Sequence, residues 1–292
     1  MNYSDACIYT GERVITKSYA KINLTLDVKG KRKDGYHELE SVMQTISLFD
    51  LLILDKHDEI KVKTNLRFLP NNEKNIAFKA ADMFFKASGI KGGARILIHK
   101  NIPVGAGLAG GSTNGAAVLT GLNRLYGNPL SMKKLFELGA RLGADVPFCM
   151  MGGTALAQGI GEKLTPLASA AGINILVVKP KIGVSTQDIF KAYDNANIPE
   201  RPDNQAMIKA IEDKNIKGIC DNVLNVLEFV SAKRYPIIKG IISTMNANGA
   251  LCSAMTGSGS AVFGIFSNAA KADNCAKLFY PDFDDVYTVI TV

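Results

Sequence analysis

The chain of 292 residues lacks the long apolar runs that cross membranes and the cysteine patterns that form disulfide frameworks. The longest apolar candidate, residues 168–178, is interrupted by polar residues and glycine, and a spanning helix needs about 20 apolar residues. Early acidic and polar residues do not form a signal-peptide core. Five widely spaced cysteines without a Cys-x-x-Cys pair favour reduced thiols. We therefore expect a cytoplasmic protein without a membrane partner.

Histidine is also scarce, because only His37, His57 and His99 occur, and none has metal-ligand spacing to another. The sequence therefore predicts no structural zinc site, and no residue is assigned as a metal ligand. The net charge of +7 would suit nucleic acid, anionic lipid or anionic small molecules. The densest basic cluster, residues 29–33, is typical of a solvated hairpin tip, and the aromatic interleaving of single-strand binders is missing. We expect no nucleic-acid partner.

A glycine-rich segment at residues 103–113 reads Pro-Val-Gly-Ala-Gly-Leu-Ala-Gly-Gly-Ser-Thr and precedes an amphipathic helix pattern. Glycine serves where the backbone takes unusual dihedral angles or approaches a ligand closely. Ser112 and Thr113 are expected to open the helix, and a helix N-terminus presents free N–H groups and partial positive charge. The segment predicts a phosphate cradle. A tight strand-to-helix turn without a ligand is the alternative.

Sequence signatures of several other classes of phosphate-binding protein are absent from this chain. A Walker A motif and the His-Arg-Asp, Asp-Phe-Gly and Ala-Pro-Glu triplets of protein kinases are absent from the sequence. The Gly-x-Gly-x-x-Gly pattern also occurs in dinucleotide-binding oxidoreductases, but residues 128–134 contain no acid for a ribose. A dinucleotide oxidoreductase and an RNA-binding module stay as alternatives from other functional classes.

Hydrophobic patterns mix strands and helices without a regular βαβ repeat, which favours an α+β fold with antiparallel or mixed sheets in two domains. Strict alternation over residues 20–28 predicts a half-buried strand. The pattern of expected strands and helices changes near residue 165, so we divide the chain into domains 1–164 and 165–292. The other expected strands are 39–54, 94–102, 173–178, 250–255, 261–266 and 285–291. The expected helices are 75–88, the segment opened by Ser112 and Thr113, 131–143, 186–193 and 268–279, with further helices between the polar loop 194–206 and Asn248.

Three polar residues stand out from these patterns. Lys21 and Asn23 project from the same face of one strand, where a solvent-facing strand edge is the simpler interpretation. Asp145 lies in an apolar stretch and is either a local cap or a desolvated catalytic base.

Three motifs are spaced along the chain. The first is the strand Lys-Ser-Tyr-Ala-Lys-Ile-Asn-Leu at 17–24, the second is the loop at 103–113, and the third is Met-Thr-Gly-Ser-Gly-Ser-Ala at 255–261. Together they resemble the GHMP kinase superfamily. The resemblance extends from about residue 16 to the end of the sequence. It implies a two-domain GHMP kinase fold, with an N-terminal ribosomal-protein-S5-like domain and a C-terminal ferredoxin-like domain.

Further motifs at 20–24, 34–39 and 143–148 resemble the branch of the superfamily that phosphorylates cytidine diphosphate methylerythritol in the non-mevalonate isoprenoid route. This resemblance implies ATP and Mg²⁺, a small-molecule substrate, and a monomer or weak homodimer. Another GHMP kinase, such as a homoserine kinase, is the nearest alternative, but it would have no use for Tyr36 and His37.

The resemblance also implies roles for individual residues. Asp145 would orient and deprotonate the substrate hydroxyl, while Lys21 keeps Asp145 ionised and neutralises charge on the transferred phosphoryl group. Tyr36 and His37 would bind cytidine, and Phe190 is either the opposite stacking wall or a core aromatic. The implied ATP-binding residues are Asn75, Lys100, Pro103, Val104, Gly105, Ala106, Gly107, Leu108, Ala109, Gly110, Gly111, Ser112 and Thr113, and the further substrate-binding residues are Asn23, Gly257 and Ser258.

Overall fold

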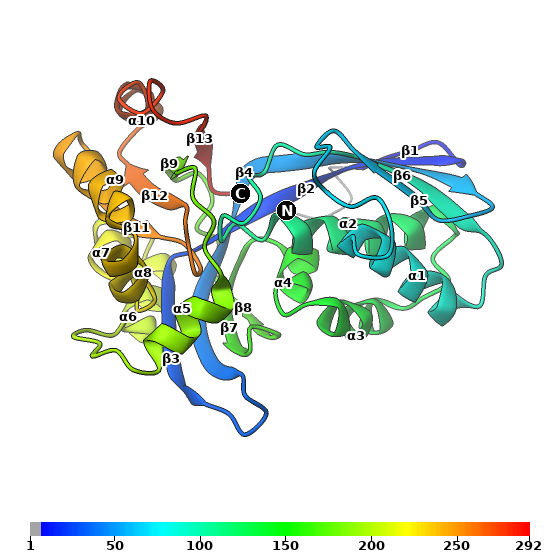
Figure 1. Ribbon diagram of the computed structural model, residues 1–292, viewed down its shortest axis with the longest axis horizontal. Helices are drawn as coiled ribbons and strands as arrows, with labels where there is room; N and C mark the ends of the chain where they lie inside the picture. Colours follow the sequence, from blue (N-terminus) through cyan, green and yellow to red (C-terminus); the bar gives the residue numbers. More distant parts are fainter. Residues whose placement is uncertain (1–6) are drawn as a thin grey trace. The chain divides into compact units, whose positions relative to one another are not determined.

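The structure is a computed structural model that describes residues 7–292 (Figure 1). The chain forms two compact units, each assembled from separate segments. Unit 1 contains the described residues up to Ala20 together with Leu48–Val104 and Ala109–Gly152, and unit 2 contains Lys21–Ser47, Gly105–Leu108 and Gly153–Val292. Strands β2 (Arg13–Asn23) and β4 (His37–His57) each contribute residues to both units. The predicted division of the chain at residues 164 and 165 stays a prediction.

In unit 1, strands and helices share one apolar core. β1 (Cys7–Tyr9) pairs antiparallel with the start of β2, and β6 (Gly93–His99) pairs antiparallel with the end of β4 and parallel with β5 (Lys61–Thr64). The helices are α1 (Ile76–Ser88), α2 (Gly110–Leu125), α3 (Met132–Leu142) and α4 (Val146–Met151). Figure 1 shows these helices beside the strands, and buried side chains such as Leu54, Ile96, Phe84 and Leu122 join the two layers.

Local capping explains where the helices of unit 1 begin and end. The Asn75 side chain accepts a hydrogen bond from the Ala77 amide at the start of α1, and Gly89 ends that helix with φ 69°. Ser131 accepts from the Lys134 amide and caps α3, as the sequence predicts. Helix α2 begins at Gly110 instead of the predicted Ser112, because Ala109 takes the left-handed conformation with φ 57°. The predicted opening of this helix was therefore two residues late.

In unit 2, two sheets are covered by helices. β3 (Thr25–Lys31) and β7 (Thr154–Gly159) pair antiparallel with the start of β4, while β8 (Lys163–Pro166) extends β7 and β10 (Leu224–Asn225) pairs parallel with β3. The second sheet is antiparallel, in the order β11 (Cys252–Met255), β12 (Val262–Phe266), β9 (Asn174–Lys179) and β13 (Asp285–Ile290). The helices are α5 (Thr186–Tyr193), α6 (Asn204–Glu212), α7 (Ile216–Asp221), α8 (Glu228–Arg234), α9 (Pro236–Ala247) and α10 (Ala269–Ala276). The mixture of helices and antiparallel sheets confirms the predicted α+β class.

The prediction of a single half-buried strand at residues 20–28 was wrong. The segment belongs to β2 and β3, which are separated by a bend at Leu24, and both of its faces are buried. The polar face is buried because each polar side chain has a partner within unit 2. Thr25 Oγ1 donates to Asn204 Oδ1 at 2.6 Å, and Arg201 donates to Asp27 at 2.7 Å. An alternating pattern shows which residues share a face, but it does not show what covers that face.

Candidate functional site

Unit 2 brings Lys21 and Asn23 of β2 to the third glycine motif. Lys21 Nζ donates to Asn23 Oδ1 at 2.7 Å, and the Asn23 amide donates to Thr256 Oγ1 at 3.0 Å. Asn23 Nδ2 also donates to Ser41 Oγ at 2.7 Å. Lys21 is 4% exposed and Asn23 is 1% exposed, so the interpretation of this segment as a solvent-facing strand edge was wrong.

The middle of the glycine loop, residues 105–108, packs against the same turn. The Ala261 amide donates to the Ala106 carbonyl at 3.1 Å, and the Lys21 amide donates to the Leu108 carbonyl at 3.2 Å. Gly107 has φ +79°, and a Cβ placed there would lie 2.2 Å from the Thr256 carbonyl oxygen. Glycine is required at this position by both conformation and space. Three motifs that are far apart in the sequence therefore meet in unit 2.

The third glycine turn is held by groups that the sequence analysis did not identify. Asn225 Nδ2 donates to the carbonyls of Met255 and Gly257, each at 2.8 Å. Glu228 accepts a hydrogen bond from the Met255 backbone amide at 2.7 Å. Burial raises the pKa of the Glu228 carboxyl, and this hydrogen bond offsets only part of the shift. The turn also carries Ser258, whose hydroxyl lies 2.8 Å from Thr186 Oγ1. The sequence feature that could have identified these two residues is the presence of one Asn and one Glu in the otherwise apolar run 223–230.

The helix that follows the loop belongs to unit 1. The first amide of α2 to bond within the helix is that of Thr113, which donates to the Ala109 carbonyl at 2.9 Å. Gly110, Gly111 and Ser112 therefore occupy the first three positions, where helix amides have no intrahelical acceptor. The Thr113 hydroxyl donates to the Tyr19 carbonyl at 2.8 Å and fixes the helix start to β2. Such an end can bind an anion.

Asp145 stands directly before α4 in unit 1 and is partly buried. It occupies the N-cap position with φ −79° and ψ −14°, and within residues 7–292 no amide of that first turn donates to its carboxylate. Its backbone carbonyl accepts from the Cys149 amide at 3.0 Å, while Val146 and Phe148 beside it are fully buried. The apolar surroundings that the sequence indicates are present, and the catalytic role stays a prediction.

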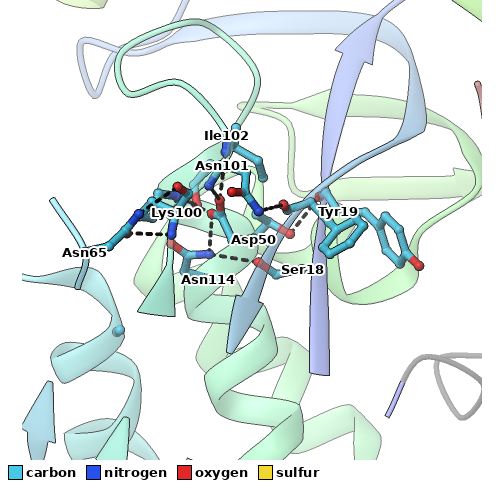
Figure 2. A network of polar contacts seen from close by, with 12 residues as sticks. Ser18, Tyr19, Asp50, Asn65, Lys100, Asn101, Ile102 and Asn114 are labelled. Carbon is cyan, nitrogen blue, oxygen red and sulfur yellow. Dashed lines mark hydrogen bonds and ion pairs between the residues drawn. The ribbon is translucent and has the colours of Figure 1, made fainter. Parts of the chain in front are cut away.

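Asn75 and Lys100, the residues predicted to lie at the adenine pocket, both have partners in unit 1. Asn75 caps α1 with its oxygen and donates from Nδ2 to the Pro70 carbonyl at 2.7 Å. Lys100 is buried, and its Nζ forms an ion pair with Asp50 and donates to Asn114 Oδ1 at 2.9 Å (Figure 2). Their contact with a nucleotide stays a prediction.

An aromatic cluster in unit 2 is formed by His37 and Phe190, two of the three aromatic residues predicted to bind cytidine. The His37 ring stacks on Phe190 of α5, with ring centroids 4.8 Å apart and an interplanar angle of 25°. Phe190 also packs at the edge of the core of unit 2, and its role as a stacking wall for cytidine stays a prediction. His37 Nε2 lies 2.6 Å from Asp194 Oδ1, and Tyr36 is 61% exposed.

A pocket of about 400 Å³ opens beside this cluster. Its lining includes His37, Asp194, Lys31 and Arg201. Lys31 Nζ lies 2.5 Å from Asp194 Oδ2, and Lys31 and then His37 hold the pKa of the Asp194 carboxyl below its ordinary value. The pocket therefore combines an aromatic wall with cationic groups, which suits an anionic ligand that carries a base.

Metal-binding clusters and membrane spans are both missing from residues 7–292. No group of three or more His, Cys, Asp or Glu side chains in that range is arranged to hold a metal ion. No helix in that range has the length and apolar character that crossing a bilayer requires.

Comparison with known proteins defines the class first. The GHMP kinases N terminal domain matches residues 75–153, and the GHMP kinases C terminal domain matches residues 207–277. The crystal structure of a 4-(cytidine 5'-diphospho)-2C-methyl-D-erythritol kinase is similar, with a TM-score of 0.80 and 32% identity, covering 95% of this chain and 98% of that one. A homoserine kinase from Cytophaga hutchinsonii has a TM-score of 0.75 over 98% of this chain and 96% of its own, but at 17% identity it shows the fold alone.

Sequence relatives narrow the class. A 4-diphosphocytidyl-2-C-methyl-D-erythritol kinase of Caldicellulosiruptor saccharolyticus is 51% identical over 91% of this chain and 93% of its own length. One from Clostridium novyi is 45% identical over 94% of this chain and 99% of its own. The chain belongs to the 4-diphosphocytidyl-2-C-methyl-D-erythritol kinase family of the GHMP kinases.

Proposed function

We propose that the chain transfers the γ-phosphoryl group of ATP to the 2-hydroxyl of 4-diphosphocytidyl-2-C-methyl-D-erythritol. The observation that carries this proposal is the convergence of Lys21 and Asn23 with the loop at 106–108 and the turn at 256–259 in unit 2. The names of the relatives and the stacked pair of His37 and Phe190 favour the cytidine substrate over homoserine.

GHMP kinases use ATP, and the loop residues supply its phosphate contacts in this proposal. The amides of Gly110, Gly111 and Ser112 at the start of α2 would donate to phosphate oxygens. Mg²⁺ would arrive with ATP as part of the substrate, because this ion usually keeps phosphate oxygens and water as ligands.

The chemical step needs a base and a positive charge. Asp145 would accept the proton of the 2-hydroxyl, whose oxygen then bonds to the γ-phosphorus while the bond to the ADP oxygen breaks. Lys21, buried and bonded to Asn23, would neutralise the charge that develops on the transferred group. The products are ADP and the 2-phosphate of the substrate.

Recognition of the base would fall to the aromatic cluster of His37 and Phe190 together with Tyr36. Tyr36 and Phe190 offer ring faces for stacking, and stacking a base contributes about 1–3 kcal/mol in nucleic-acid complexes. When neutral His37 donates from Nε2 to Asp194, its Nδ1 becomes an acceptor, which suits the exocyclic amino group of cytosine. The cationic lining of the adjacent pocket suits the diphosphate.

A coupled assay of ADP release with a panel of alcohols tests the proposal. We expect turnover with 4-diphosphocytidyl-2-C-methyl-D-erythritol, with the new phosphate on its 2-oxygen by ³¹P NMR. Homoserine and mevalonate serve as the comparison substrates. Phosphorylation of either one, with none of the cytidine compound, would contradict the assignment.

The proposal also includes a cytoplasmic location and a monomer or weak homodimer. The free thiols of Cys149, Cys220, Cys252 and Cys275 are consistent with a reducing compartment. Sedimentation velocity across a range of protein concentrations distinguishes a monomer from a weak dimer.

A further inference from the structure

A buried polar network in unit 1 joins the two flanks of the glycine loop (Figure 2). It contains Asp50 of β4, Lys100 just after β6, and Asn114 in the second turn of α2. Asp50 is 0% exposed and Asn114 is 3% exposed. Figure 2 shows these side chains converging, with Asn101 and Ile102 on one side and Ser18 on the other. The roles proposed above leave Asp50 and Asn114 without a function.

The two carboxylate oxygens of Asp50 contact different segments of the chain. Oδ1 accepts from the backbone amides of Asn101 at 2.7 Å and Ile102 at 2.8 Å, which immediately precede the loop. Oδ2 accepts from Asn114 Nδ2 at 2.8 Å and forms an ion pair with Lys100. One side chain thus binds both the segment that enters the loop and the helix that leaves it.

The Lys100 ammonium completes the connection. Besides its ion pair with Asp50, Nζ donates to Asn114 Oδ1 at 2.9 Å and to the Gly110 carbonyl at 3.2 Å. An ammonium group has three protons, and these three partners use all of them. Burial lowers the pKa of the Lys100 ammonium, and Asp50 opposes that shift. The charge of Lys100 is therefore used to hold the start of α2.

We infer that Asp50 is a positioning residue for ATP, because it fixes Ile102 and Asn114 on either side of the glycine loop. The amides at the start of α2 are then already oriented when the phosphates arrive, so little ordering is needed on binding. This inference rests on the proposed function, in which those amides hold ATP. In this inference Lys100 acts by holding the start of α2, and not by contacting adenine directly.

The isosteric change Asp50→Asn tests the inference, and Asp55→Asn is a matched control on the same strand. Asp55 also bridges two cations, Arg13 at 2.6 Å and Arg95 at 2.8 Å, but its partners lie outside the loop flanks. We expect Asp50→Asn to raise the dissociation constant of a non-hydrolysable ATP analogue and the KM for ATP about tenfold or more, which corresponds to about 1.4 kcal/mol. The KM for the alcohol substrate should stay within twofold. Asp55→Asn should lower the melting temperature without changing either ATP constant.

A second variant covers the case in which Asp50→Asn does not fold, because it leaves a buried ammonium without its carboxylate. Asn114→Ala keeps the ion pair but removes the two side-chain contacts of α2 with Asp50 and Lys100, and leaves only the bond from Lys100 to the Gly110 carbonyl. It should also weaken binding of the analogue in calorimetry. Folded variants that bind the analogue as the wild type does would overturn the inference. Equal losses of affinity in Asp50→Asn and Asp55→Asn would also overturn it, because they would indicate a general loss of stability. A wild-type protein that does not bind the analogue would instead contradict the proposed function itself.

Discussion

At the scale of single residues, Asp145 and Lys21 have different surroundings that suit their proposed roles. Asp145 is partly buried and lies directly before the apolar helix α4. Lys21 is buried and oriented by Asn23, so its ammonium has a fixed direction before substrate binds.

We expect Asp145→Asn to lower kcat about 100-fold or more while ATP affinity stays nearly unchanged, because an amide accepts no proton from the substrate. Stopped-flow or coupled kinetics give kcat, and calorimetry with an ATP analogue provides the control. Lys21→Ala should also lower kcat, and the double variant should lose less than the product of the two effects. A near-normal kcat for Asp145→Asn would assign this residue to the start of α4 and remove it from the chemistry.

At the scale of structural elements, the glycine loop and the third glycine turn depend on each other. Gly105 and Gly107 both have positive φ, +65° and +79°. A Cβ at Gly105 would meet nothing within 4 Å, whereas one at Gly107 would overlap the Thr256 carbonyl. Comparing alanine substitutions at these two glycines therefore separates the effect of an unfavourable backbone conformation from the effect of steric overlap.

Gly107→Ala should therefore lower the melting temperature and weaken ATP binding more than Gly105→Ala does. The Gly105 variant carries only the strain of a left-handed non-glycine residue, which is of order 1 kcal/mol. Gly107→Ala must in addition displace the loop or the turn at 256–259. Thermal unfolding and calorimetry measure both effects. Equal losses in the two variants would show that the contact between loop and turn adds nothing.

Element boundaries were predictable where capping chemistry or periodicity is local. Helices α1, α3 and α5 follow the predicted ranges because Asn75, Ser131 and Ser185 cap them. The short helix α4 and strands β7 and β8 were missed, since a few residues do not display a period. The bend at Leu24 also has no local signal, because the alternation continues through it.

At the scale of the whole molecule, the site was predictable as separate motifs and not as an arrangement. Asn23 and Thr256 are 233 positions apart and share a hydrogen bond, which no local pattern records. Only the resemblance to a family placed these motifs together in advance. Asp50 and Asn225 were missed because each acts through backbone contacts formed only in the folded chain.

The stability of the whole molecule should depend on pH through carboxyl groups with shifts of opposite sign. Arg13 and then Arg95 hold the pKa of Asp55 below its ordinary value, so its stabilising contribution is present above the unfolded value of about 3.9 and is lost as the pH falls through the folded value. Burial raises the pKa of Glu228, so its contribution is complete below the unfolded value of about 4.3 and is lost as the pH rises through the folded value.

Melting temperatures of the wild type, Asp55→Asn and Glu228→Gln between pH 3 and pH 8 test this expectation. Asp55→Asn should be less stable than the wild type at pH 7. The difference should shrink as the pH falls below about 4, because the unfolded carboxyl takes up a proton before the folded one does. Glu228→Gln keeps an oxygen that can accept from the Met255 amide, and its stability relative to the wild type should increase as the pH rises. If both differences stay constant across the range, neither carboxyl changes its protonation differently in the folded and unfolded chains. Differences of opposite slope would confirm that the ion pair at Asp55 stabilises the charged form while the site around Glu228 disfavours it.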